Sequence, residues 1–105
     1  MNTSNESVIS IFRIARMCMG LSLDEMAEKC NVSAIYLSEL ERGKKTNPSD
    51  EFINKFANGC YISSRTIKYF LEHPKSREYY QQHFIREIER MAIRSMVLDN
   101  HNIVQ

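Results

Sequence analysis

The sequence contains no tryptophan, only three glycines and only two prolines among its 105 residues. Glycine and proline disfavour helix interiors, so their scarcity leaves long stretches in which helices can form. No stretch alternates apolar and polar residues clearly enough to predict a strand. We therefore predict an all-α chain, and its length corresponds to one domain with or without an added terminal element.

The sequence also lacks an excess of one charge sign and a long apolar run. Its 14 basic and 13 acidic side chains argue against a non-specific coat for nucleic acid, which needs a large positive excess. No run reaches the ~18 apolar residues that span a bilayer, and the polar segment 1–6 does not resemble a signal peptide. We expect a cytoplasmic protein without a membrane partner and with a flexible N-terminus over residues 1–6.

The three cysteines, Cys18, Cys30 and Cys60, are too widely spaced for a C-x-x-C motif. This spacing favours buried free thiols in a reducing compartment. The three histidines do not complete a zinc site, so we expect no metal and no cofactor. There is also no nucleophile–base pair and no phosphate-binding loop, so we expect no enzymatic activity.

Apolar residues recur at helical spacing in five segments between residues 7 and 73. The first segment covers about residues 7–19 and ends at Gly20, because glycine commonly follows the last turn of a helix. Serine residues are good N-caps and mark the starts of the other four segments. These serines are Ser22, Ser33, Ser49 and Ser63.

The second and third helices are joined by the short turn "NVS", residues 31–33. Asn31 tolerates the left-handed conformation that such a turn requires. The small Ala27 allows the two helices to approach closely, and Val32 and Leu37 fill the angle between them. Two short capped helices with this connection have the outline of a helix-turn-helix.

Residues 21–49 resemble the helix-turn-helix of the phage-repressor/Cro-like (XRE) transcriptional regulators, and the resemblance extends more weakly over residues 8–72. The matching residues are Leu21, Ser22, Ala27, Val32, Ser33, Tyr36, Ser38, Glu41, Arg42, Gly43, Lys44, Asn47, Pro48 and Ser49. The resemblance implies a five-helix, repressor-like bundle over residues 7–73, whose third helix enters the major groove of double-stranded DNA. The chain departs from the family at Leu23 and Ala34, where many relatives carry polar residues.

The predicted DNA-binding residues form two groups. Those on or near the exposed face of the third helix are expected to reach base edges; they are Ala34, Ile35, Ser38, Glu39 and Arg42. Those expected to contact phosphates are Ser22, Tyr36, Arg42, Lys44 and Lys45. Arg16 and Ser33 are also predicted to be DNA-binding residues. Glu39 either accepts a hydrogen bond from cytosine or is a solvated bystander. Glu41 is predicted to pair with Arg13 or Arg16 within the chain.

Residues 74–105 are predicted to form a long C-terminal helix with a broad apolar face. This face consists of Tyr80, Phe84, Ile88 and Met91, flanked by Ile85, Ala92 and Met96. An amphipathic face of this width needs to be covered, either by folding back on the bundle or by pairing with a second copy. We favour a homodimer, because two recognition helices one helical turn apart read a palindromic site.

Three functions agree with these patterns. The leading hypothesis is a sequence-specific DNA-binding transcriptional regulator, a repressor that acts as a dimer. The second is an antitoxin whose C-terminal segment binds a toxin and whose helix-turn-helix regulates its own gene. The third is a protein-interaction module that has lost DNA binding. The near-neutral charge, Leu23, Ala34 and Glu39 favour the third hypothesis, whereas the basic residues after the third helix favour DNA.

Overall fold

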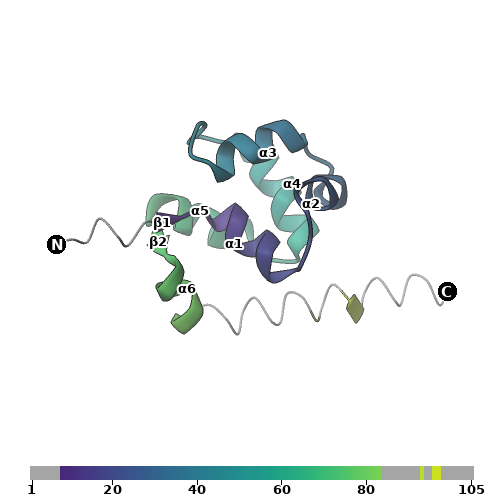
Figure 1. The fold of residues 1–105 in the computed structure, drawn as a ribbon. Coiled ribbons are helices and arrows are strands. Elements are labelled where there is room, and N and C mark those ends of the chain that lie inside the picture. The colour runs from purple at the N-terminus through teal and green to yellow at the C-terminus, as the bar shows by residue number, and fades with distance from the viewer. Residues whose placement is uncertain (1–7, 84–92, 94–95, 98–105) are drawn as a thin grey trace.

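The computed structural model describes residues 8–83, 93, 96 and 97. The chain folds into a helical bundle that carries a two-stranded sheet at one end (Figure 1). The helices are α1 (Ile11–Cys18), α2 (Leu23–Cys30), α3 (Ala34–Glu41), α4 (Asp50–Cys60), α5 (Ser64–Glu72) and α6 (Arg77–His83). The strands are β1 (Val8–Ile9) and β2 (Lys75–Ser76). The predicted five-helix bundle is therefore confirmed, with a small sheet and α6 added to it.

Serine side chains begin the helices of the bundle as the sequence predicts. The Ser22 hydroxyl accepts a hydrogen bond from the Glu25 backbone N–H, at 3.1 Å, and the Glu25 carboxylate accepts one from the Ser22 N–H, at 2.8 Å. This reciprocal capping box satisfies two backbone donors at the start of α2. Ser33, Ser49 and Ser63 cap α3, α4 and α5 in the same sense, each by accepting from a backbone N–H.

An aromatic cluster between α1 and α4 lies at the centre of the bundle. The ring of Phe12 meets those of Phe52 and Phe56 edge to face, with centroids 5.6 and 4.8 Å apart. Edge-to-face pairs at this distance add to the stabilisation that burial provides. Apolar side chains from the other helices of the bundle surround the cluster; they include Met26, Leu37, Leu40, Ile53 and Ile67. This core fixes the positions of α2 and α3, which carry the candidate site.

All three cysteines are free thiols, as predicted. Cys30 and Cys60 are buried where α2 and α4 meet, but Cys18 is only half-buried and not buried as predicted. Hydrogen bonding to Cys30 and burial raise the pKa of the Cys60 thiol, and burial raises the pKa of Cys18. Thiols with a raised pKa stay protonated near neutral pH and pack as small apolar groups.

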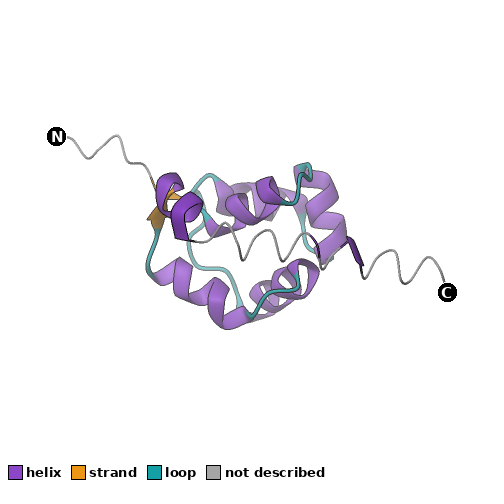
Figure 2. Cartoon of the chain, turned by 90° about the horizontal axis from the view of Figure 1, so that it is seen from below, coloured by secondary structure: helices purple, strands orange, loops and turns teal. Residues whose placement is uncertain are grey.

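The first helix begins later than the sequence predicts. Ser10, not a residue near position 7, is its N-cap, and the Ser10 hydroxyl accepts from the Phe12 N–H at 3.1 Å. The residues before it form β1, in which Val8 and Ile9 pair antiparallel with Ser76 and Lys75 (Figure 2). Strands of two residues are too short to show an alternating pattern, so the prediction of a chain without strands was wrong here.

Tyr80 was predicted to lie on a face that either folds back on the bundle or pairs with a second copy, and in the structure it folds back. Its side chain is 1% exposed, and its ring lies 5.3 Å from Phe70 and 5.9 Å from Tyr79. The packed unit therefore continues past the predicted boundary at residue 73. Met96 is 63% exposed. The other predicted interface residues, Phe84, Ile85, Ile88, Met91 and Ala92, lie outside the described residues. Within the described part of the chain, no helix has the length and apolar character needed to cross a membrane.

Gly59 allows α4 to pass close to α2. A Cβ atom at position 59 would lie 3.0 Å from the Cα of Cys30 and would overlap its side chain. We expect Gly59→Ala to lower the free energy of unfolding by about 1–3 kcal/mol, because overpacking displaces one helix from the other. Chemical denaturation measures this, with Asn58→Ala at the neighbouring exposed position as the control. Equal stability of the two variants would contradict the close approach.

Candidate nucleic-acid interface

The turn between α2 and α3 sets the angle between the two helices of the helix-turn-helix. Asn31 adopts the left-handed conformation, with φ of 58°, and the Val32 N–H donates to the Ala27 carbonyl at 2.9 Å. The Ser33 hydroxyl then accepts from the Tyr36 N–H at 3.1 Å and begins α3. The chain therefore changes direction within three residues, and α3 lies on the outside of the bundle (Figure 1).

Helix α3 has one buried and one exposed face. Leu37 and Leu40 are 0% and 5% exposed, whereas Ile35 is 75% exposed. Ser38 and Glu39 are half-buried and Arg42 is exposed. These three follow Ile35 at intervals of three, four and seven residues, so they share its face of the helix. The structure thus brings together four of the five residues predicted to reach base edges.

The fifth, Ala34, is half-buried and packs against the hydrophobic core, as does Leu23 at the start of α2. Both are positions where the chain departs from the XRE pattern. Their apolar side chains thus contribute to packing in this chain. Ser22 is exposed at the start of α2, where its hydroxyl already caps that helix.

An ion pair between Arg16 and Glu41 ties α1 to the last residue of α3. Arg16 donates from Nε and Nη2 to the two carboxylate oxygens of Glu41, at 2.8 and 2.9 Å. A third donor, Nη1, lies 3.1 Å from the Leu21 carbonyl oxygen. The two side chains are 19% and 6% exposed. The predicted internal partner of Glu41 is confirmed, and it is Arg16.

The same contacts change the role expected of Arg16. It was predicted to be a DNA-binding residue, but three of its donors are engaged within the chain. Hydrogen bonding to Glu41 raises the pKa of its guanidinium, although burial acts in the opposite direction. Arg16 therefore holds α3 in place, and its half-buried position leaves little of it accessible.

The basic residues after α3 lie on a loop whose backbone is held by the helix itself. Gly43 has φ of 79°, and the N–H groups of Lys44 and Lys45 both donate to the Glu39 carbonyl, at 2.8 and 3.2 Å. Arg42, Lys44 and Lys45 are exposed. Cations at the C-terminal end of a helix are favoured by its dipole. The loop therefore presents three positive charges in a fixed place at the end of the exposed face.

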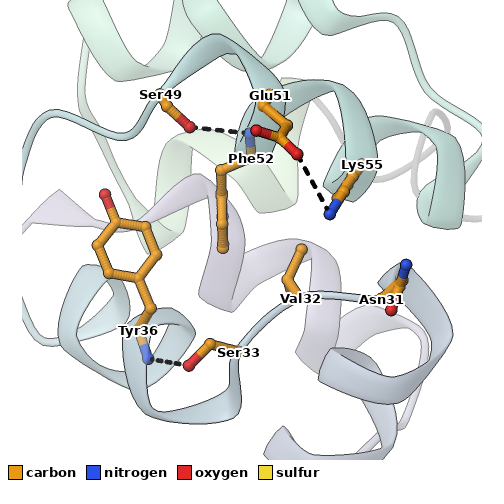
Figure 3. Close-up of a pocket in the computed structure, with 8 residues that line it drawn as sticks. All are labelled: Asn31, Val32, Ser33, Tyr36, Ser49, Glu51, Phe52 and Lys55. Carbon is orange, nitrogen blue, oxygen red and sulfur yellow. Dashed lines mark hydrogen bonds and ion pairs between the residues drawn. The ribbon is translucent and has the colours of Figure 1, made fainter.

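A cavity of about 520 Å³ lies between the start of α3 and the start of α4 (Figure 3). Ser33 and Tyr36 line it from the start of α3, and Ser49 and the ion pair of Glu51 with Lys55, at 3.4 Å, line it from α4. The Tyr36 ring packs on Phe52, with centroids 5.0 Å apart. Hydroxyl groups beside two helix N-termini suit a phosphate oxygen. Sequence reasoning identified Ser49 as a cap but missed that it lines the same cavity as Ser33, because only the fold brings the two helix starts to one cavity.

No group of three or more His, Cys, Asp or Glu side chains that could hold a metal occurs within the described ranges. The side chains gathered around α3 are instead hydroxyls, cations, the Glu39 carboxylate and one exposed apolar group, Ile35. Such a set can donate hydrogen bonds to anionic oxygens and contact a methyl group.

The chain belongs to the helix-turn-helix family, whose sequence model matches residues 12–64. Among its relatives is the HTH-type transcriptional regulator SinR of Bacillus subtilis, 44% identical over 48 residues, which are 46% of this chain and 43% of SinR. The transcriptional regulator ClgR of Mycobacterium tuberculosis is 45% identical over 57 residues, covering 54% of this chain and 50% of ClgR. The matched segments thus span half of these relatives or less. No solved structure matches the chain with significance.

The ion pair between α1 and α3 predicts a specific pattern of stability. Arg16→Met leaves the Glu41 carboxylate buried without its partner, so we expect a loss of about 3 kcal/mol in the free energy of unfolding. Arg16→Met combined with Glu41→Leu removes both charges and should recover most of that loss, but not the hydrogen bond to Leu21. Denaturation by urea measures the wild type, the two single variants and the double variant. If the loss in free energy of unfolding of the double variant equals the sum of the losses of the two single variants, the buried pair is not coupled.

Proposed function

We propose that this protein is a sequence-specific DNA-binding transcriptional regulator, a repressor that acts as a dimer and reads a short operator through α3. The observation that carries the proposal is the outward face of α3, where exposed Ile35 and the half-buried Ser38 and Glu39 lead to exposed Arg42. A single helix with one such face fits the major groove of B-form DNA. The family and the names of the relatives support the same function.

Each residue of this face has a chemical role in the proposal. The Ile35 side chain contacts a thymine methyl group, the Ser38 hydroxyl donates to or accepts from a base edge, and the Glu39 carboxylate accepts from the cytosine amino group. Glu39 is the most discriminating residue of the three, because a carboxylate only accepts hydrogen bonds and therefore disfavours guanine and thymine, whose edges in the major groove offer acceptors but no donor.

Phosphates on either side of the groove are bound at the two ends of α3. At its start, Ser33, Tyr36 and Ser49 lie around one cavity. At its end, Arg42, Lys44 and Lys45 are exposed. Contacts of this kind set the position and orientation of a reading helix without selecting a sequence.

Selection from a random double-stranded DNA library tests the function. We expect one short, palindromic sequence to be enriched. The affinity of the protein for this DNA should fall steeply between about 50 and 200 mM salt, because salt screens the phosphate contacts. Fluorescence anisotropy with the enriched DNA measures this. If no sequence is enriched, the regulator hypothesis fails and a protein-interaction module becomes the better description.

Two single substitutions separate base reading from phosphate binding. Glu39→Gln should change the preferred base at one position of each half-site, by about 1–3 kcal/mol of discrimination, because the amide presents both a donor and an acceptor. Lys44→Ala should weaken binding to all DNA sequences alike and reduce the salt dependence of that binding. Repeated selection with each variant measures the difference. An unchanged preference in Glu39→Gln would show that Glu39 is a bystander.

The proposed dimer rests on the apolar face predicted for the C-terminal segment, without Tyr80. Because β2 and Tyr80 belong to the packed unit, a truncation should keep residues 1–83 and remove residues 84–105. We expect light scattering to show a dimer for the whole chain and a monomer for the truncated one. The helical circular dichroism of residues 8–83 should persist as the control for folding. A truncated chain that keeps the dimer mass would place the interface elsewhere.

A further inference from the structure

A second groove, of about 380 Å³, lies at the end of α3 opposite to the cavity described above. It forms where β1, the start of α1, the loop after α3 and the end of α5 meet. Its lining residues are different from those of the first cavity. Its volume lies in the range of sites that bind small molecules, about 300–1,000 Å³.

The walls of this groove are mainly apolar. Val8 is 62% exposed at its edge, so the groove opens on a hydrophobic side chain that faces water. Apolar surface exposed inside a concave site favours a ligand with an apolar body. The deeper walls consist of Ile9, Ile11, Phe12, Leu40, Phe70 and Leu71.

The charged residues of the groove are mostly cationic. Arg42 and Lys45 line it and are exposed. The Glu41 carboxylate also lines it, but both of its oxygens are bonded to Arg16, so its charge is compensated. Lys44, between the two cations in sequence, does not line the groove. The groove therefore joins an apolar wall to two positive charges at one edge.

We propose that this groove binds a small monocarboxylate with an apolar chain, such as a medium-chain fatty acid, and that the ligand competes with DNA. The apolar chain lies along the wall formed by β1 and α5, and the carboxylate accepts hydrogen bonds from Arg42 and Lys45. A guanidinium binds a carboxylate through two parallel hydrogen bonds, which suits Arg42 to this role. The binding itself is independent of the proposed function, but the competition rests on it, because the same two cations are proposed to hold phosphates.

Isothermal titration calorimetry of the whole chain with decanoate, below its micelle concentration, tests the binding. We expect saturable binding of one ligand per chain, and little heat with decanol, which lacks the charge. Lys45→Gln should lower the affinity for decanoate about threefold to fivefold, which is the scale of an exposed ion pair. The matched Lys44→Gln should leave the affinity for decanoate unchanged. Val8→Ser should also lower this affinity. Absence of saturable binding, or equal effects of the two lysine variants, would overturn the site.

The competition is measured with the DNA selected above. Decanoate should raise the apparent Kd for that DNA in the wild-type chain and in Lys44→Gln, and less in Lys45→Gln. Decanoate that binds the chain but leaves its DNA affinity unchanged would overturn the competition. If no DNA sequence is selected, the proposed regulator function is wrong. Calorimetry then still decides separately whether the groove binds the carboxylate.

Discussion

The ion pair between Arg16 and Glu41 is the constraint on which the position of α3 depends. Two hydrogen bonds join the guanidinium to the carboxylate, and a pair bonded at two points resists rotation as well as separation. Because Glu41 is the last residue of α3, the pair fixes the end of the helix, while Leu37 and Leu40 fix its middle in the core. Ile35 is then left facing outward.

The same pair decides where charge is found around α3. The chain as a whole is nearly neutral, which by itself argues against binding a polyanion. Within α3 and the loop that follows, however, the Glu41 charge is compensated internally, and only the Glu39 carboxylate remains beside three exposed cations. A near-neutral chain can therefore present a local positive surface, since screening leaves nearby charges dominant over distant ones.

The parts of the structure that depend on local chemistry could be predicted from the sequence. The hydroxyl of a serine at the N-cap lies close to the backbone N–H three residues later, so the caps at Ser22 and Ser33 follow from sequence order. The pairing of β1 with β2 and the burial of Tyr80 join distant segments, and no local pattern encodes them. The choice of Arg16 as the partner of Glu41 lies between these cases, because it depends on how α1 packs against α3.

The two ends of α3 differ in a way that bears on selectivity. Its start lies beside a cavity lined by hydroxyl groups, two helix N-termini and the ion pair of Glu51 with Lys55. Hydroxyl groups and helix N-termini suit a phosphate oxygen regardless of what else the ligand carries. Its end places Arg42 and Lys45 beside an apolar wall, so the free energy of binding there also depends on whether the anion carries an apolar chain. A phosphate backbone offers no such chain at that position. On the proposed function, the end of α3 is therefore the place where a small amphipathic anion would compete with DNA.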